Sequence, residues 1–320
     1  MTRLVVVGGG HSHVEVLRQF GADPMRGVAV TLVSTGRLTP YSGMLPGLVA
    51  GHYGFDECHI DLDPLARYAR AAFHQGTAAG LDPGKKQIRL DSGETIGYDV
   101  LSLDIGSTPV TRGVPGAEGC AIPAKPVERL LEGWDAVRRA AAAGTVRDIV
   151  VAGGGAAGIE LALAMRHRLA AELHFASVPR MRLVTDAQRL LETYPPVLGS
   201  LMLRLLERNE VQVSLDSRVL AVEPRQLRTA RRDRIAFDAL FWITGAQASA
   251  WPAESGLATD ARGFVLVDDA LRSVSHPEVF AAGDCASQRG RRTPKSGVYA
   301  VRQGRSSRAT WAPRWRAARS

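Results

Sequence analysis

Short apolar runs that end in glycine recur along this chain, and segments of helical or alternating polarity lie between them. Residues 4–7 are continuously apolar, three glycines follow, and the next stretch, "HSHVEVLRQF", is helix-like. Residues 149–152 begin the same series, with "IELALAMRHRLAAEL" as the helical stretch. A short apolar run bounded by turn residues is typical of a buried parallel strand. The pattern therefore predicts units of strand, glycine turn and helix.

The chain contains two copies of one plan. "VVVGGGHSHVEV" from Val5 matches "VVAGGGAAGIEL" from Val150, and "YDVLSLDIGSTP" from Tyr98 matches "FDALFWITGAQA" from Phe237. Before each member of the second pair, turn residues separate short β-like runs, as in a β-meander. We therefore predict an α/β fold with parallel sheets, made of two Rossmann-like dinucleotide-binding domains that each carry a β-meander.

Two signals divide the chain into domains. The stretch "GVPGAEGCAIPAKPVE" between the copies is rich in Pro and Gly and predicts a linker. After the second copy, a further apolar strand ends on Gly283 and Asp284, which suggests that the chain returns to the first domain. We expect one domain of residues 1–121 and 248–320, with a second domain of residues 122–247 inserted in it.

Charge limits the classes of partner. The formal net charge of +8 comes from residues 289–320, which contain ten Lys or Arg and no acidic residue, so the rest of the chain is near neutral. No motif that reads DNA or RNA accompanies this basic end, and we expect no nucleic-acid partner. Residues 305–320 hold five Arg, two Trp and no Leu, Ile or Val. Such a segment cannot bury enough apolar surface to fold, so we expect a disordered tail.

The sequence also predicts a location. No apolar run approaches the length of a membrane span, and the first strand begins too early for a signal peptide. The expected location is the cytoplasm. The basic tail adds the option of peripheral contact with anionic lipid at the inner face of the cell membrane.

The second glycine turn is a complete G-x-G-x-x-G motif, made of Gly153, Gly155 and Gly158. Its glycines permit the tight turn, the approach of backbone to a pyrophosphate and close packing of helix on strand. An acidic residue should then end the next strand and hold a ribose. Asp186 is the candidate, but Arg189 is near enough to meet a 2′-phosphate, so the choice between NADH and NADPH stays open.

The first glycine turn is a variant of the same motif. Gly8 and Gly10 take the first two roles, whereas His13 stands where the packing glycine belongs. We expect its side chain to point away from the strand, or the helix to stand slightly off. His11 and His13 lack the further ligands that a metal ion needs, so we expect no metal here. A position facing the phosphate or solvent is favoured for both, and a direct role of His11 beside a flavin is the alternative. The following strand ends on Ser34 in place of an acid.

These residues resemble a known family. "VVVGGG", "IVVAGGGAAGIELA" and "VFAAGDCA" are similar to the pyridine nucleotide-disulfide oxidoreductase superfamily. Within it, the chain looks like type II NADH dehydrogenases and sulfide:quinone reductases. "GGGHSHVEVLRQF", "TPYSGMLPGLVAGHY" and "PKSGVYAVRQG" are most similar to the NADH dehydrogenase-like module often fused ahead of selenide, water dikinase. The resemblance spans residues 4–304.

The resemblance implies a two-dinucleotide-binding flavoprotein with FAD on the first turn and NAD(P)H on the second. The expected reaction moves a hydride from nicotinamide to flavin and then electrons to a quinone or another small acceptor, with a link to selenium metabolism. The implied FAD-binding residues are Gly8, Gly10, His11, Ser12, Ser34, Gly106, Gly283 and Asp284, with Asp284 on the ribityl chain. The implied NAD(P)H-binding residues are Gly153, Gly155, Gly158, Glu160, Asp186 and Gly245.

Two alternatives to this reaction stay open, a sulfide:quinone reductase-like enzyme and a flavin-binding, redox-responsive scaffold with little turnover. Cys58, Cys120 and Cys285 form no paired spacing, so we expect neither disulfide chemistry nor a catalytic cysteine. Lys295, in "PKSG", is the candidate for a catalytic charge near the flavin or acceptor, with a solvated loop lysine as the alternative.

Overall fold

The computed structural model describes residues 1–108, 113–174, 177–291, 295 and 297–304. The predicted tail at residues 305–320 lies outside this part of the chain. The described residues form two compact units. Unit 1 holds Met1–Ser42, His59–Thr108 and the described residues from Ala246 onward. Unit 2 holds Gly43–Cys58 and the described residues between 113 and 245. Among the described residues, no helix has the length and apolar character needed to span a bilayer.

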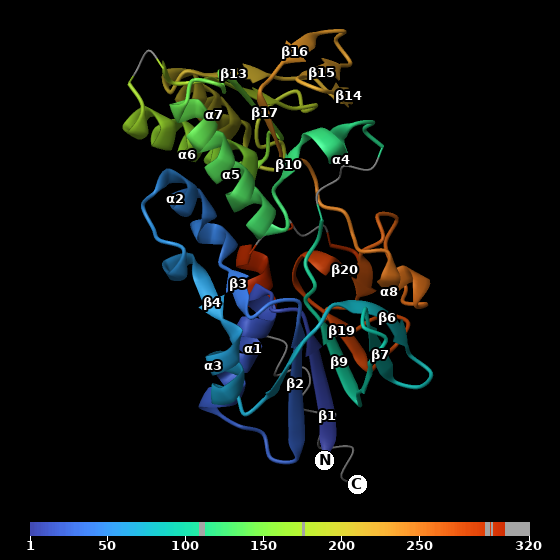
Figure 1. Ribbon diagram of the computed structural model, residues 1–320. Coiled ribbons are helices and arrows are strands. Elements are labelled where there is room, and N and C mark those ends of the chain that lie inside the picture. Colours follow the sequence, from blue (N-terminus) through green and yellow to red (C-terminus); the bar gives the residue numbers. More distant parts are fainter. Residues whose placement is uncertain (109–112, 175–176, 292–294, 296, 305–320) are drawn as a thin grey trace. The chain divides into compact units, whose positions relative to one another are not determined.

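Unit 1 is built on a parallel sheet of five strands in the order β19-β9-β1-β2-β5 (Figure 1). The strands are β1 (Thr2–Val7), β2 (Val28–Ser34), β5 (Ala72–Gln75), β9 (Val100–Leu103) and β19 (Val279–Ala281). Because successive side chains of a strand face opposite sides, Leu4 and Val6 pack in one core and Val5 and Val7 in another. Helices α1 (His11–Ala22) and α3 (Leu62–Tyr68) cover the first side.

The other side of this sheet carries an antiparallel meander. The meander strands are β6 (Ala78–Asp82), β7 (Gln87–Leu90) and β8 (Thr95–Gly97). The remaining short elements of unit 1 are β3 (Leu38–Pro40), β4 (His59–Asp61), α8 (Trp251–Glu254), β18 (Val265–Val267) and β20 (Ala286–Gln288). Residues 297–304 are helical.

Unit 2 repeats this architecture with a parallel sheet in the order β10-β17-β11-β12-β13. Its strands are β10 (Ile122–Pro123), β11 (Asp148–Ala152), β12 (Arg180–Val184), β13 (Val211–Ser214) and β17 (Ala239–Trp242). Its helices are α2 (Leu45–Ala50), α4 (Ala117–Cys120), α5 (Val127–Ala142), α6 (Ala156–Glu172) and α7 (Pro196–Arg208). Its meander strands are β14 (Val219–Glu223), β15 (Gln226–Thr229) and β16 (Arg234–Ala236).

The two sheets have the same strand order, which confirms the predicted repeat. β1 and β11 are the central strands that precede the glycine turns, β2 and β12 lie on one side of them, and β9 and β17 lie on the other. In unit 2, too, Ile149 and Val151 face the helices, while Val150 and Ala152 face the meander. β19 joins the unit 1 sheet beside β9, so the chain returns to its first sheet after the second copy.

Two features differ from the predicted segmentation. The expected linker contains α4, β10 and the start of α5, and Ile122 pairs with Phe241 in the unit 2 sheet. Residues 113–121, expected in the first domain, therefore belong to unit 2. Second, residues 43–58, expected in the first domain, pack in unit 2. Val49 lies in the core of that unit, and its carbonyl accepts a hydrogen bond from the Trp134 indole at 3.3 Å. The apolar side chains of α2 are buried against α5 and α6, which explains this placement.

Candidate functional site

The carboxyl edge of the unit 1 sheet gathers most of the residues predicted to bind FAD. β1 runs into Gly8, β2 ends at Ser34, β9 leads to Gly106, and β19 leads to Gly283 and Asp284. Adjacent parallel strands end at the same edge, and open α/β sheets bind ligands outside their carboxyl ends. The fold therefore brings together residues that are far apart in the sequence.

Three glycines at this edge surround the side chain or carbonyl of one residue, Asp104. Gly8 has φ +98°, and a Cβ added to it would lie 2.2 Å from the Asp104 carbonyl oxygen. A Cβ at Gly10 would lie 2.4 Å from the Asp104 carboxylate, and a Cβ at Gly283 would lie 2.3 Å from its Oδ1. All three positions require glycine because this buried residue occupies the space that a side chain would need.

Asp104 follows β9, the strand beside β1, and caps the first turn of α1. Its Oδ2 accepts hydrogen bonds from the backbone N–H groups of Ser12 at 2.9 Å and His13 at 3.2 Å. Only 5% of the residue is exposed. Burial raises the pKa of the Asp104 carboxyl to about 6, although the two N–H groups and nearby His11 oppose that rise. A carboxylate thus already lies at one of the two helix starts predicted to face a phosphate.

Asp104 is a site residue that the sequence motifs do not single out. It lies in "DIGSTP", two residues before the predicted Gly106, and the matching position of the second copy is Ile243. The one available signal was this acid-for-apolar difference between otherwise similar strand ends.

The His13 ring reaches from α1 to β9, so the first predicted alternative, a side chain that points away from the strand, is wrong. The ring is buried, so the expectation that it faces the phosphate or solvent is wrong as well. Its Nδ1 lies 2.7 Å from the Gly8 carbonyl oxygen, and its Nε2 lies 2.8 Å from Ser102 Oγ. A carbonyl can only accept, so Nδ1 carries the proton and Nε2 accepts from the Ser102 hydroxyl. The ring is 1% exposed, and burial lowers its pKa to about 4. His13 is therefore neutral at physiological pH.

The matching position in unit 2 shows what this imidazole replaces. There Gly158 packs so closely that an added Cβ would lie 2.0 Å from the Gly153 carbonyl oxygen. His13 instead places its ring against the Gly8 carbonyl, at the position where Gly158 has no side chain.

His11 and Ser12 face in different directions. His11 Nε2 lies 3.3 Å from Ser42 Oγ, and its ring centroid lies 5.1 Å from that of Tyr41. Ser12 is fully buried, and its hydroxyl donates to the Ala300 carbonyl at 2.7 Å. Ser12 thus anchors the helix at residues 297–304 to α1. Across the described chain, no group of three His, Cys, Asp or Glu side chains could hold a metal ion.

Asp284 lies in a short 3-10 turn, Gly283–Cys285, at the end of β19. Its carboxylate is partly exposed, and Oδ2 accepts a hydrogen bond from Ser107 Oγ at 3.3 Å. The N–H of Gly283 donates to Gln303 Oε1 at 2.7 Å, which fixes the turn. A partly exposed carboxylate at this edge is suited to accept hydrogen bonds from the hydroxyl groups of a bound polyol.

Lys295 contacts other residues of unit 1. Its Nζ lies 4.0 Å from the centroid of the Phe264 ring and donates a hydrogen bond to the Ala286 carbonyl. Burial lowers the pKa of the Lys295 ammonium, while nearby Cys285 and Asp284 raise it. The side chain is therefore partly buried and engaged, unlike the solvated loop lysine of the alternative prediction.

The second glycine turn leaves open space where a phosphate would lie. A Cβ at Gly153 would lie 2.5 Å from the Ile243 carbonyl oxygen, whereas a Cβ at Gly155 would have no atom within 4 Å. Gly155 is also the N-cap of α6, and it supplies no side-chain cap. The first N–H groups of α6 therefore border free space, which fits the pyrophosphate of a dinucleotide.

The other predicted NAD(P)H-binding residues lie around this turn. Gly245 follows β17, Asp186 is exposed after β12, and Glu160 is exposed on α6, where desolvation raises the pKa of its carboxyl. The Arg189 guanidinium donates to the carbonyls of Glu192 at 2.6 Å and of Tyr194 at 3.0 Å. Arg189 therefore stabilises its own loop.

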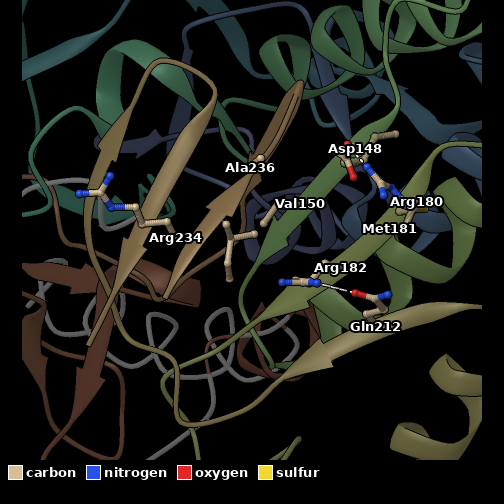
Figure 2. Close-up of a pocket in the computed structure, with 10 residues that line it drawn as sticks. Asp148, Val150, Arg180, Met181, Arg182, Gln212, Arg234 and Ala236 are labelled. Atoms are coloured by element: carbon tan, nitrogen blue, oxygen red, sulfur yellow. Dashed lines mark hydrogen bonds and ion pairs between the residues drawn. The ribbon is translucent and has the colours of Figure 1, made fainter. Parts of the chain in front are cut away.

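A separate cavity of about 260 Å³ lies at the opposite, amino-terminal end of the unit 2 strands (Figure 2). Asp148 and Arg180 form an ion pair there at 2.7 Å, and the Arg182 guanidinium donates to Gln212 Oε1. Because dinucleotides bind at the carboxyl ends of such strands, this cavity is not the predicted nucleotide site.

The three cysteines are free thiols. Cys58 and Cys285 are buried and Cys120 is partly exposed. Burial raises the pKa of the Cys285 thiol to about 12 and also raises that of Cys58. Because the thiolate is the reactive form, neither buried cysteine is suited to be a nucleophile near neutral pH.

Comparison with known proteins places this geometry in a family. The NADH dehydrogenase-like protein of Mycobacterium tuberculosis is 27% identical over 315 residues, a match that covers 90% of this chain and 74% of that protein. The external NADH-ubiquinone oxidoreductase 2 of Saccharomyces cerevisiae mitochondria is 22% identical over 321 residues, covering 90% of this chain and 58% of that protein.

A solved structure shares the fold. The sulfide:quinone oxidoreductase of Aquifex aeolicus superposes with a TM-score of 0.83 at 18% identity, covering 98% of this chain and 77% of that one. The family model for pyridine nucleotide-disulphide oxidoreductases matches residues 2–304. This match confirms the predicted class of enzyme and implies FAD and NAD(P)H as cofactors. The chain belongs to the pyridine nucleotide-disulphide oxidoreductase family.

Proposed function

We propose that this chain takes electrons from NAD(P)H into FAD and passes them to a small acceptor, with quinones as the first class to test. The observation that carries the proposal is one glycine turn repeated at the carboxyl edges of two parallel sheets, at residues 8–10 and 153–155. Each such edge suits one dinucleotide, so the chain offers a place for each of the two cofactors.

Unit 1 is the proposed FAD-binding unit. FAD, when bound, supplies the redox chemistry of the enzyme. The backbone of Gly10 and His11 would receive the pyrophosphate, because Asp104 already accepts from the next two N–H groups. Ser34 would bind the ribose, and Asp284 the ribityl hydroxyls. Gly106 borders open space at this edge, since a Cβ there would have no atom within 4 Å.

Unit 2 is the proposed NAD(P)H-binding unit. The open space at Gly155 and the N-terminal N–H groups of α6 would receive the second pyrophosphate. Asp186 is exposed at the end of β12 and can bind the ribose hydroxyls. Because Arg189 is engaged by loop carbonyls, we favour NADH over NADPH as the donor.

The proposed electron acceptor is a quinone. The yeast relative is named for ubiquinone, which supports a quinone here. The resemblance to the module fused to selenide, water dikinase adds selenium compounds to the candidates. Sulfide oxidation is disfavoured, because it would use cysteines as nucleophiles and two of the three thiols here are buried with raised pKa values. Lys295 remains the proposed positive charge near the reacting groups.

Anaerobic spectroscopy tests the proposal. The purified protein should carry FAD, and NADH should bleach its visible absorbance within one turnover. Quinones, selenium compounds and sulfur compounds are then added singly to the reduced protein, and the acceptor is the compound that restores the absorbance fastest. Bleaching by sulfide but not by NADH would favour the sulfide-oxidising alternative. Bound FAD that neither donor bleaches would favour a redox-responsive scaffold.

A further inference from the structure

His52 and His167 come together on the surface of unit 2, although 115 residues separate them. Their Nε2 atoms lie within hydrogen-bond distance at 3.3 Å, and their ring centroids lie 5.1 Å apart with an interplanar angle of 66°. His52 follows α2, and His167 lies on α6, against which α2 packs (Figure 1). Both residues are exposed, so a hydrated ion can reach the two nitrogens.

The backbone holds His52 firmly. Gly51 ends α2 in a left-handed conformation, with φ +82°, and donates to the Leu48 carbonyl at 3.0 Å. The N–H of His52 donates to the Gly47 carbonyl at 2.8 Å. The Trp134 indole holds the preceding turn through Val49. His167 lies within a helix of 17 residues, so both rings project from fixed backbone.

The separation of the two nitrogens matches a pair of ligands on one ion. Two Zn–N bonds of about 2.0–2.1 Å at a tetrahedral angle place the nitrogens about 3.3–3.4 Å apart. A square-planar ion with bonds of similar length would need them about 2.9 Å apart. We infer that His52 and His167 form a two-histidine site for a divalent transition metal, with zinc as the best fit.

The surroundings define what kind of site this is. No third His, Cys, Asp or Glu joins the pair within the described ranges, so water would complete the coordination. The Arg168 guanidinium packs beside Gly51 and is paired with Glu172 at 2.6 Å, a carboxylate that it shares with Arg138. Two protein ligands and open positions predict weaker binding than in a closed structural zinc site.

The site is separate from the proposed nucleotide site. His167 lies nine residues beyond Gly158 on α6, which is about 13 Å along the helix. A bound ion would fasten residues 43–58 to α6, within unit 2. The expected consequence is a more stable attachment of α2, which does not depend on whether the chain binds FAD or NADH.

Titration calorimetry with zinc chloride tests the site, using the full chain with any affinity tag removed. We expect one zinc ion per chain in the wild type. H52A and H167A should each lower the affinity at least about tenfold, since loss of even an outer-shell partner costs that much. H174A removes an exposed histidine elsewhere in unit 2 and should leave the affinity unchanged.

A second readout keeps the test independent of calorimetry. Zinc should raise the thermal midpoint of the wild type and of H174A but not of H52A or H167A, because a ligand stabilises only the state that binds it. Midpoints measured without zinc show whether each variant is folded. Absence of zinc binding by the wild type, or equal binding by a folded H52A or H167A, would overturn the inference.

Discussion

The imidazole Nδ1 of His13 lies 2.7 Å from the carbonyl oxygen of Gly8, the first glycine of the same turn. The contact joins the start of α1 to the end of β1, where the second copy uses the bare backbone of Gly158. The histidine in this glycine motif therefore has a structural role, because both of its ring nitrogens form hydrogen bonds. It also predicts how stability responds to pH.

The first prediction concerns His13→Gln, compared with wild type by urea unfolding between pH 4 and pH 8. The folded-state pKa of His13 is about 4 and the ordinary value is 6.5, so the unfolded chain binds more protons between these values. The His13 contribution to stability is thus present above pH 6.5 and is lost as pH falls toward 4, by about 3 kcal/mol. The variant should lack this dependence.

A matched control for His13 is His276→Ala. His276 bonds Ser275 Oγ at 3.0 Å in an exposed contact. Its removal should change the unfolding free energy by less than about 0.5 kcal/mol. A His13→Gln difference curve that is flat with pH would show that the imidazole titrates normally, contrary to its burial.

The second prediction concerns Asp104→Asn, whose pH dependence should have the opposite sign. Burial raises the pKa of Asp104 from 3.8 to about 6, so the folded state binds more protons between these values. The Asp104 contribution is thus complete below pH 3.8 and falls by about 3 kcal/mol as pH rises through 6. Relative to wild type, the asparagine variant should gain stability over this range. A constant difference between pH 4 and pH 7 would contradict the account of Asp104.

The third prediction concerns Asp284→Ala and FAD affinity. If Asp284 accepts hydrogen bonds from ribityl hydroxyls, the variant should bind FAD more weakly by about 1–3 kcal/mol. Fluorescence titration of the apoprotein with FAD measures the change. Asp260→Ala is a control of the same type, because Asp260 accepts from backbone N–H groups in its own loop, at Arg262 and Phe264. Equal FAD affinity for wild type and Asp284→Ala would remove Asp284 from the site.

The fourth prediction concerns the thiols. A variant with Cys58, Cys120 and Cys285 all replaced by Ala should keep the wild-type rate of bleaching by NADH, because no thiolate takes part. The loss of two buried side chains should still lower the unfolding free energy by about 1–3 kcal/mol. Stopped-flow absorbance and urea unfolding separate the two effects. Slow bleaching in a variant that unfolds normally would mean that a cysteine is catalytic.

The sequence predicted the glycine turns and the repeat because backbone geometry demands particular residues at those positions. Gly8 and Gly153 must be glycine, since carbonyl oxygens lie where their side chains would be. Asp104 was not predicted, because its contact with Ser12 spans 92 residues and appears only when β9 and α1 meet. The direction of His13 depended in the same way on Ser102, which lies on another strand.

The placement of α2 shows the same limit. Residues 43–58 lie between two segments of unit 1 in the sequence, and local pattern assigns them to that unit. Their apolar side chains are buried in the other unit, against helices that occur much later in the chain. Local patterns do not indicate which of the two units a segment packs in. For that reason the sequence does not predict the contact between His52 and His167.

Gly155→Val distinguishes the two glycine turns, which are proposed to hold two different dinucleotides. A Cβ at Gly155 meets no protein atom within 4 Å, so valine should fill only the space proposed for the NAD(P)H pyrophosphate. Gly119→Val is the matched control, because Gly119 is exposed and its Cβ position is equally open.

The measurement is FAD content together with anaerobic bleaching by NADH. We expect full FAD content in both variants. At an NADH concentration that bleaches the wild type, Gly155→Val should not bleach, whereas Gly119→Val should bleach normally. Wild-type bleaching by Gly155→Val, or loss of its FAD, would contradict the assignment of one dinucleotide to each turn.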